Sequence, residues 1–314
     1  MVSRTCRGYR PESTRPDPPA HRITRRADSS MTLIDHLREI AGDYDLFLID
    51  QWGVIHNGHT LLPGARDAFE ALRRDGKSIV LISNSSRRAS VSEAALTALG
   101  IDRALYDDVV TSGEVAWRQM KERTDPFYAA LGGTCFLVSW LPDSVFHEGQ
   151  DFAPVDTLDA ASFVLLAGTK APLAEYEEML QAAARRGLPM VCLNRDMVSV
   201  APDGTLIDCA GKLAARYEEL GGAVRYNGKP GKEMYQACLA VAPSKSRPLA
   251  IGDSLHHDIA GANGAGIESV LITSGIHAAE LGVEDGGALS AERLEALCTE
   301  YGGRPDYAMF RMTW

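Results

Sequence analysis

The sequence lacks long apolar runs, closely spaced cysteines and an excess of basic charge. No apolar stretch approaches the roughly 20 residues that a transmembrane helix needs, so a membrane partner is not indicated. The 6 cysteines are scattered over 314 residues without a Cys-x-x-Cys pair, which argues against a zinc site. The formal net charge of −10 argues against nucleic acid as a bulk electrostatic partner. Free thiols without a recognisable signal peptide predict a cytoplasmic protein.

The charge is unevenly distributed along the chain. Residues 1–30 contain seven arginines and carry a net charge of +4, whereas the remaining residues carry −14. This leading segment is rich in proline and poor in apolar residues, so it cannot bury enough surface to offset its ordering entropy. We therefore expect residues 1–30 to form a disordered extension, with the folded protein beginning at Met31.

From residue 31 onward, short apolar runs alternate with amphipathic helical patterns, as in βαβ units with a parallel sheet. Strands are expected at 46–49, 78–82, 109–110, 135–138, 163–167, 190–193, 223–226, 249–251 and 269–272. The pattern predicts an α/β protein with a doubly wound parallel sheet, interrupted by a second α/β unit. We place the main domain at 31–113 and 209–314, and the inserted domain at 114–208.

Polar side chains follow several of the predicted strands. These residues are Asp50, Ser83, Asn84, Lys229 and Asp253. An Asp or Ser at such a position is often only the N-cap of the next helix, but ligands in open α/β sheets bind beyond the carboxyl ends of the strands. Such a set of groups indicates a phosphoryl-transfer site. One carboxylate can act as nucleophile, another acid can bind Mg²⁺, and the hydroxyl and ammonium groups can hold phosphate oxygens.

Four segments that contain these residues resemble the motifs of haloacid dehalogenase-like (HAD) hydrolases, in the same order. They are LIDQWGV at 48–54, LISNS at 81–85, GKP at 228–230 and IGDSLHHDI at 251–259. The PGA at 63–65 resembles the NagD-like, class IIA branch. The resemblance implies a Rossmann-like core with an inserted α/β cap domain of the C2 type, and a phosphatase that acts on a small phosphorylated metabolite.

The resemblance also implies roles for individual residues. Asp50 would attack phosphorus and form an aspartyl-phosphate, while Lys229 would neutralise the phosphoryl group. Ser83 and the backbone amide of Asn84 would hold its oxygens. Mg²⁺ would be bound by Asp50, Asp253 and the backbone carbonyl of Trp52. Asp258 would bind the metal through water or orient its ligands, although an acid in the first turn of a helix is an equal alternative.

Trp52 departs from the family pattern, which has a second aspartate at this position to protonate the leaving group and later activate water. An indole cannot transfer a proton in this way. One interpretation is that His56, His256 or His257 replaces the missing acid, since histidine titrates near neutral pH; the alternative is that they are exposed loop residues. A second is that the leaving group needs no acid. A third is a catalytically impaired protein that binds a phosphorylated ligand in a regulatory role.

The inserted domain is expected to select the substrate, as caps do in this family. Asn194, Arg195 and Asp196 follow a predicted strand, where relatives usually carry Asn-Pro-Asp. Arg195 could bind an anionic group of the substrate or lie exposed on a turn. Trp140 is expected to pack in the cap, with stacking on an aromatic ligand as the alternative. The resemblance also implies a possible homodimer.

Overall fold

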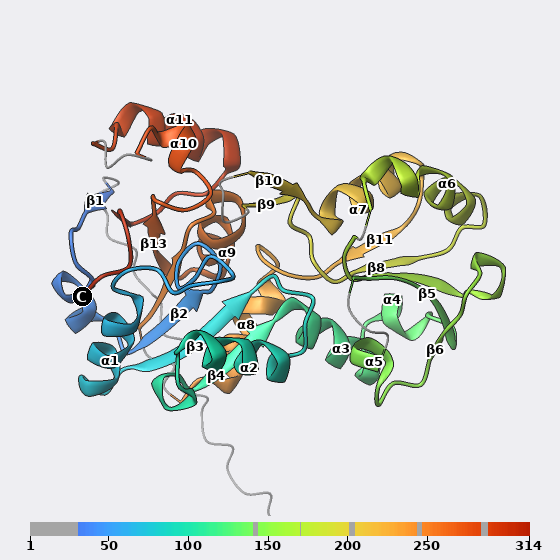
Figure 1. Ribbon diagram of the computed structural model, residues 1–314, viewed down its shortest axis with the longest axis horizontal. Coiled ribbons are helices and arrows are strands. Elements are labelled where there is room, and N and C mark those ends of the chain that lie inside the picture. The colour runs from blue at the N-terminus through green and yellow to red at the C-terminus, as the bar shows by residue number, and fades with distance from the viewer. Residues whose placement is uncertain (1–30, 141–143, 170, 201–204, 244–246, 284–287) are drawn as a thin grey trace, which may run out of the picture.

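The computed structural model describes residues 31–140, 144–169, 171–200, 205–243, 247–283 and 288–314. The disorder expected for residues 1–30 therefore lies outside the described residues. Two parallel sheets, each covered by helices, form a larger core and a smaller neighbouring domain, which we call the cap (Figure 1). The expected α/β fold with a doubly wound parallel sheet is confirmed.

The core is built on a seven-stranded parallel sheet, in the order β1-β14-β13-β12-β2-β3-β4. Its strands are β1 (Thr32–Leu33), β2 (Leu46–Asp50), β3 (Ser78–Ser83), β4 (Asp108–Thr111), β12 (Pro248–Gly252), β13 (Glu268–Ile272) and β14 (Tyr307–Met309). Successive side chains of β2 enter different hydrophobic clusters: Phe47 and Ile49 pack on one face, and Leu46 and Leu48 on the other. This two-sided burial explains why the strands read as continuous apolar runs.

Helices cover both faces of the core sheet. On one face lie α1 (Ala65–Arg74) and α2 (Ala89–Leu99), and on the other lie α8 (Lys232–Val241) and α9 (Ala260–Ala265). A further cluster joins α10 (Ala278–Leu281) and α11 (Ala291–Tyr301) to β13 and β14. Short 3₁₀ turns occupy Leu37–Glu39, Ala41–Asp43, Arg103–Leu105, Leu158–Ala160 and Leu173–Tyr176.

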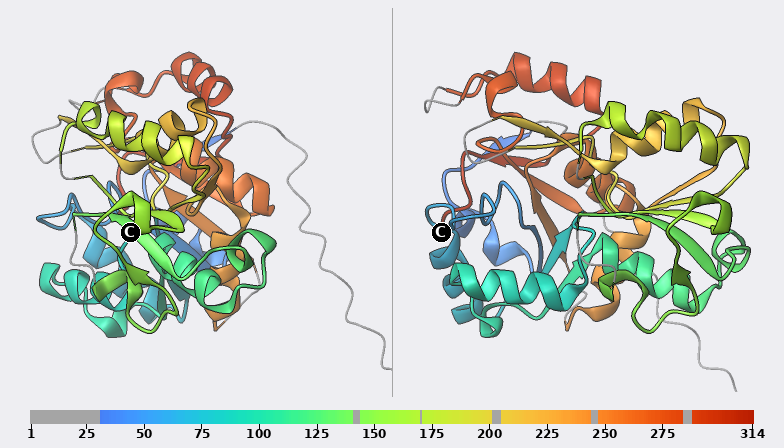
Figure 2. Two further views of the ribbon diagram at one scale, coloured as in Figure 1. Left: turned by 90° about the vertical axis from the view of Figure 1, so that its right-hand side faces the viewer. Right: turned by 45° about the vertical axis from the view of Figure 1, so that its right-hand side comes forward.

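The cap contains a five-stranded parallel sheet, in the order β11-β8-β7-β5-β6. Its strands are β5 (Thr134–Val138), β6 (Ala153–Pro154), β7 (Phe163–Leu166), β8 (Met190–Cys192) and β11 (Val224–Tyr226). One face is covered by α6 (Glu177–Arg185) and α7 (Ala210–Glu219), and the other by α3 (Ser112–Glu122), α4 (Pro126–Ala129) and α5 (Ser144–His147), as Figure 2 shows. An antiparallel pair, β9 (Val198–Val200) and β10 (Leu206–Asp208), completes the cap.

The expected end of the inserted domain at residue 208 is wrong. Strand β11 pairs with β8 of the cap sheet, and α7 packs with α6 in the same hydrophobic cluster. The chain therefore returns to the core only after Tyr226. A helix followed by a short strand has the same periodicity in either domain, so the sequence pattern could not tell which sheet this pair joins.

The structure also bears on the expectations about a membrane span and about the cysteines. No helix among the described residues is both long enough and apolar enough to cross a membrane. The side chains of Cys135, Cys192 and Cys238 are buried, as expected for small core residues.

Phe69 provides a test of the core packing. It is fully buried between α1 and the sheet, so we expect Phe69→Ala to lower the free energy of unfolding by about 3–5 kcal/mol in urea denaturation. Leu33→Ala is the matched control: its side chain is 59% exposed, and its truncation should change stability by less than about 0.5 kcal/mol. Equal losses in the two variants would contradict this packing.

Candidate active site

The residues predicted from the strand ends converge at one edge of the core sheet. Asp50 ends β2, Ser83 ends β3 and Asp253 directly follows β12, and these three strands are neighbours in the sheet. They line a cavity of about 800 Å³ whose wall includes residues of both core and cap. Parallel strands all end at the same edge, so their last side chains are brought together.

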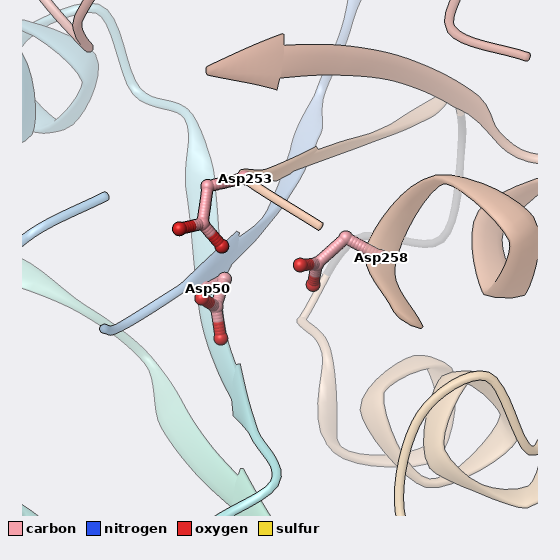
Figure 3. A group of neighbouring side chains, drawn as sticks. All are labelled: Asp50, Asp253 and Asp258. Carbon is pink, nitrogen blue, oxygen red and sulfur yellow. The ribbon is translucent and has the colours of Figure 1, made fainter. Parts of the chain in front are cut away.

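Three buried carboxylates lie close together in this cavity. Oxygen atoms of Asp50, Asp253 and Asp258 lie within 4.8 Å of one another, and Figure 3 shows the side chains converging on a shared space. Asp258 lies in a short π-helical segment (Leu255–Ile259) and accepts a hydrogen bond from the Ser254 amide at 3.2 Å. The expected group of acids therefore includes all three aspartates.

Lys229 lies between two of these acids. Its Nζ is 2.5 Å from Asp50 Oδ1 and 2.7 Å from Asp258 Oδ1, and all three side chains are buried. Burial alone would lower the pKa of Lys229, but Asp258 and Asp50 raise it well above its ordinary value. The side chain is therefore a fixed ammonium beside the predicted nucleophile.

The acids outnumber this one positive charge. Burial raises the pKa of Asp50 to about 7, although Lys229 acts in the opposite direction. Burial also raises the pKa of Asp253 well above its ordinary range, and the charges of Asp50 and Asp258 add to the effect. Crowded carboxylates are the oxygen ligands that Mg²⁺ prefers, and a divalent cation would relieve their repulsion. The donor set thus fits a divalent metal.

Close backbone packing holds the Asp253 carboxylate in place. The Ile276 amide donates a hydrogen bond to Asp253 Oδ2 at 2.9 Å. A Cβ atom at Gly53, where φ is +82°, would lie 2.0 Å from the same oxygen. Glycine at position 53 therefore permits both the left-handed turn and the approach of the loop to the acid.

A hydrogen-bonded chain connects this site to the cap. Asn84 Nδ2 donates to Asp196 Oδ1 of the cap at 2.6 Å, and Asn84 Oδ1 accepts from the Lys229 amide at 2.6 Å. Asp196 Oδ1 is also 3.5 Å from Nδ1 of His257. Sequence reasoning assigned Asn84 only a backbone role and missed this connection, because no local pattern relates residues 112 positions apart.

Comparison with known proteins agrees with this geometry. A family profile described as haloacid dehalogenase-like hydrolase matches residues 47–141, and a HAD-hydrolase-like profile matches 226–297. Sugar-phosphatase AraL of Bacillus subtilis is 30% identical over 236 residues, which are 73% of this chain and 82% of the relative. The chain belongs to the haloacid dehalogenase-like hydrolases.

Solved structures of the HAD-like hydrolases share the fold. A haloacid dehalogenase-like hydrolase from Brucella suis has a TM-score of 0.74 and 30% identity, and covers 89% of this chain and 100% of its own. Glycerol phosphate phosphatase from Mycobacterium tuberculosis, in complex with magnesium, has a TM-score of 0.58 and 27% identity over 76% of this chain and 70% of its own. The expected family, and with it an enzyme of the phosphoric monoester hydrolase type, is confirmed.

The three histidines considered as replacement acids in this HAD-like hydrolase differ in position. Burial, with a smaller contribution from the charge of Arg87, lowers the pKa of His56 to about 4. Burial likewise lowers the pKa of His257 to about 3. Both line the cavity, whereas His256 is exposed and is not among the described residues of the cavity wall. At neutral pH the two lining imidazoles are neutral, so neither is a ready proton donor.

Only some of the residues that we expect to select the substrate lie at the cavity. The described wall of the cavity includes Asn194 and Asp196 but not Arg195, whose guanidinium lies 5.2 Å from the centre of the Tyr226 ring. Trp140 lines the cavity and is 45% exposed, so the expectation that it packs within the cap is wrong. Its position after the last residue of β5, at the cap edge facing the core, explains the exposure.

Gly228 allows a test of the connection through Asn84. Its φ is +109°, and an added Cβ would lie 2.7 Å from Asn84 Oδ1. Gly228→Ala should therefore displace Asn84 and the Lys229 loop and lower hydrolase activity by about 100-fold, as displaced catalytic groups do. Gly221→Ala is the control, since Gly221 has φ +86° with nothing within 4 Å of its added Cβ.

Both glycine substitutions should lower stability by about 1–2 kcal/mol because each forces a side chain into the left-handed region, and Gly228→Ala should lose more because its Cβ also crowds Asn84. Stability measured by thermal unfolding and activity measured on the same preparations separate the two effects. An equal loss of activity in both variants would show that the Asn84 contact is unimportant.

Proposed function

We propose that the protein is a Mg²⁺-dependent phosphatase that hydrolyses a small phosphorylated metabolite through an aspartyl-phosphate on Asp50. The observation that carries this proposal is the buried contact between Lys229 Nζ and Asp50 Oδ1, beside the carboxylates of Asp253 and Asp258. Such a site presents a nucleophile and a compact positive charge to one phosphoryl group.

The metal is supported by the donor set and by a relative. Glycerol phosphate phosphatase from Mycobacterium tuberculosis was solved with magnesium. Here Asp50, Asp253 and the backbone carbonyl of Trp52 would hold the ion, with Asp258 orienting the group. When bound, Mg²⁺ supplies positive charge that offsets the carboxylates and polarises a phosphoryl oxygen.

In the first half of the reaction, a carboxylate oxygen of Asp50 forms a bond to phosphorus while the bond from phosphorus to the alcohol oxygen breaks. Ser83 Oγ, at the end of β3 on the cavity wall, donates a hydrogen bond to a phosphoryl oxygen. Lys229 neutralises the charge that remains on the transferred group. The alcohol oxygen leaves with the bonding electron pair and takes a proton from water, because position 52 carries an indole.

In the second half, water attacks the phosphorus of the aspartyl-phosphate. The bond between phosphorus and the Asp50 oxygen breaks, inorganic phosphate leaves, and the free carboxylate is restored. Without an aspartate at position 52, no side chain there removes the proton from this water. We therefore propose a slower reaction on substrates with poor leaving groups than on those with good ones.

Asp50→Asn tests the covalent step. The amide is nearly the same size as the carboxylate but is a poor nucleophile, so phosphate release with Mg²⁺ should fall to below about one thousandth of wild type. Rapid acid quench and intact-mass measurement should detect a phosphorylated chain in the wild type and none in the variant. Asp45→Asn is the matched control, because Asp45 is exposed and precedes the opposite end of β2.

Unchanged phosphate release in Asp50→Asn would remove the covalent mechanism. Wild-type protein that binds phosphate with Mg²⁺ but releases none from alkyl, aryl or acyl phosphates would instead support the alternative of a phosphorylated-ligand-binding regulator.

Trp52→Asp tests the missing acid. A carboxylic acid at this position should raise kcat for alkyl phosphates by at least about tenfold, since general acid–base catalysis contributes roughly 10²–10⁴-fold. Trp52→Asn removes the indole without adding a group that transfers protons, and should give no such gain. Equal gains in both variants would show that the indole obstructs the site rather than depriving it of an acid.

A further inference from the structure

Two tryptophans present exposed indole surface to the same cavity as the phosphoryl site. Trp52 of the core is 41% exposed and Trp140 of the cap is 45% exposed, and both line the cavity. Large aromatic side chains usually bury most of their surface, so two exposed indoles on one cavity wall are a feature to be explained by what the cavity binds.

Each indole packs closely against a glycine. A Cβ at Gly168 would lie 2.1 Å from Cδ1 of Trp140, and a Cβ at Gly58 would lie 2.4 Å from Cη2 of Trp52. Any side chain at either glycine would displace the ring. The glycine backbone therefore packs against both indoles, and each indole still keeps more than two fifths of its surface exposed.

Each indole has one further side-chain neighbour on the cavity wall. The guanidinium of Arg87 lies 4.9 Å from the centre of the Trp140 ring, and the His56 ring lies 5.8 Å from that of Trp52 in an edge-to-face arrangement. Both Arg87 and His56 line the cavity. We call Trp52, His56, Arg87 and Trp140 the indole wall; its aromatic rings and guanidinium make it polarisable.

We propose that the substrate is a phosphomonoester whose alcohol carries a flat aromatic ring, and that this ring stacks on the indole wall. The proposal rests on the proposed function, because Asp50 and Lys229 then hold the phosphoryl group at the other part of the cavity. An aromatic ring gains from offset or edge-to-face contact with indole, whereas a puckered ring of similar size gains only from burial.

A comparison of benzyl phosphate with cyclohexylmethyl phosphate distinguishes the effect of ring stacking from the effect of the leaving group. Both release a primary alcohol through a CH₂–O bond, so they differ mainly in whether the ring is flat. We expect wild-type kcat/KM to be at least about fivefold higher for benzyl phosphate, mostly through KM. In Trp140→Leu this ratio should fall close to one.

Trp117→Leu is the matched control. Trp117 lies under the guanidinium of Arg88, 3.8 Å from the ring centre, and is not among the described residues of the cavity wall. The ratio of the two substrates should therefore keep its wild-type value in this variant, even if Trp117→Leu lowers stability. Thermal unfolding of all variants confirms that folded proteins are compared.

Binding of the corresponding phosphonates gives a readout that needs no turnover. Benzylphosphonate should bind at least about fivefold more tightly than cyclohexylmethylphosphonate in the presence of Mg²⁺, and should change the tryptophan fluorescence of wild type more than that of Trp140→Leu. Equal affinity of the two phosphonates, or a preference that survives in Trp140→Leu, would overturn the aromatic substrate. Failure to hydrolyse either ester would count against the proposed phosphatase, while the phosphonate ratio would still decide the stacking proposal.

Discussion

The contact of the Lys229 ammonium with two buried carboxylates is the interaction on which the rest of the site depends. Removing an ion from water costs several kcal/mol, so these groups remain charged only while they are paired. One ammonium, that of Lys229, faces the carboxylates of both Asp50 and Asp258, and Asp253 adds a third carboxyl group beside them, so the site is short of positive charge. That deficit is the electrostatic reason why the site suits a divalent cation and then an anionic phosphoryl group.

The same lysine couples the cap to the core. Strand β11, the last strand of the cap sheet, ends at Tyr226, three residues before Lys229. The Lys229 amide is held by Asn84, which also holds Asp196 of the cap. A displacement of the cap would therefore be transmitted to the charge that faces the nucleophile, both along the chain and through the side chain of Asn84. The position of the cap and the geometry around Lys229 are therefore coupled in this arrangement.

Trp52 links the chemistry to the shape of the cavity. Its indole stands where the resemblance to HAD-like hydrolases implies an acid, and it also contributes exposed aromatic surface to the cavity wall. The low pKa values of His56 and His257 follow mainly from burial, and nearby positive charges add to the effect, so the cavity that favours charge pairing also disfavours a local proton donor. A flat leaving group that departs readily would suit both properties of this residue.

Much of the fold and of the acidic site could be predicted from the sequence, because buried parallel strands form apolar runs and their last polar residues must meet at one edge. Asp50, Ser83, Asp253 and Lys229 were placed in this way. The sequence alone determined the period of burial, the order of the motifs and the chemical groups available. Only the tertiary structure decided that β11 joins the cap sheet, that Asp196 reaches Asn84 and that Trp140 faces the cavity. These are contacts between distant segments, and periodicity records whether a residue is buried but not which partner buries it.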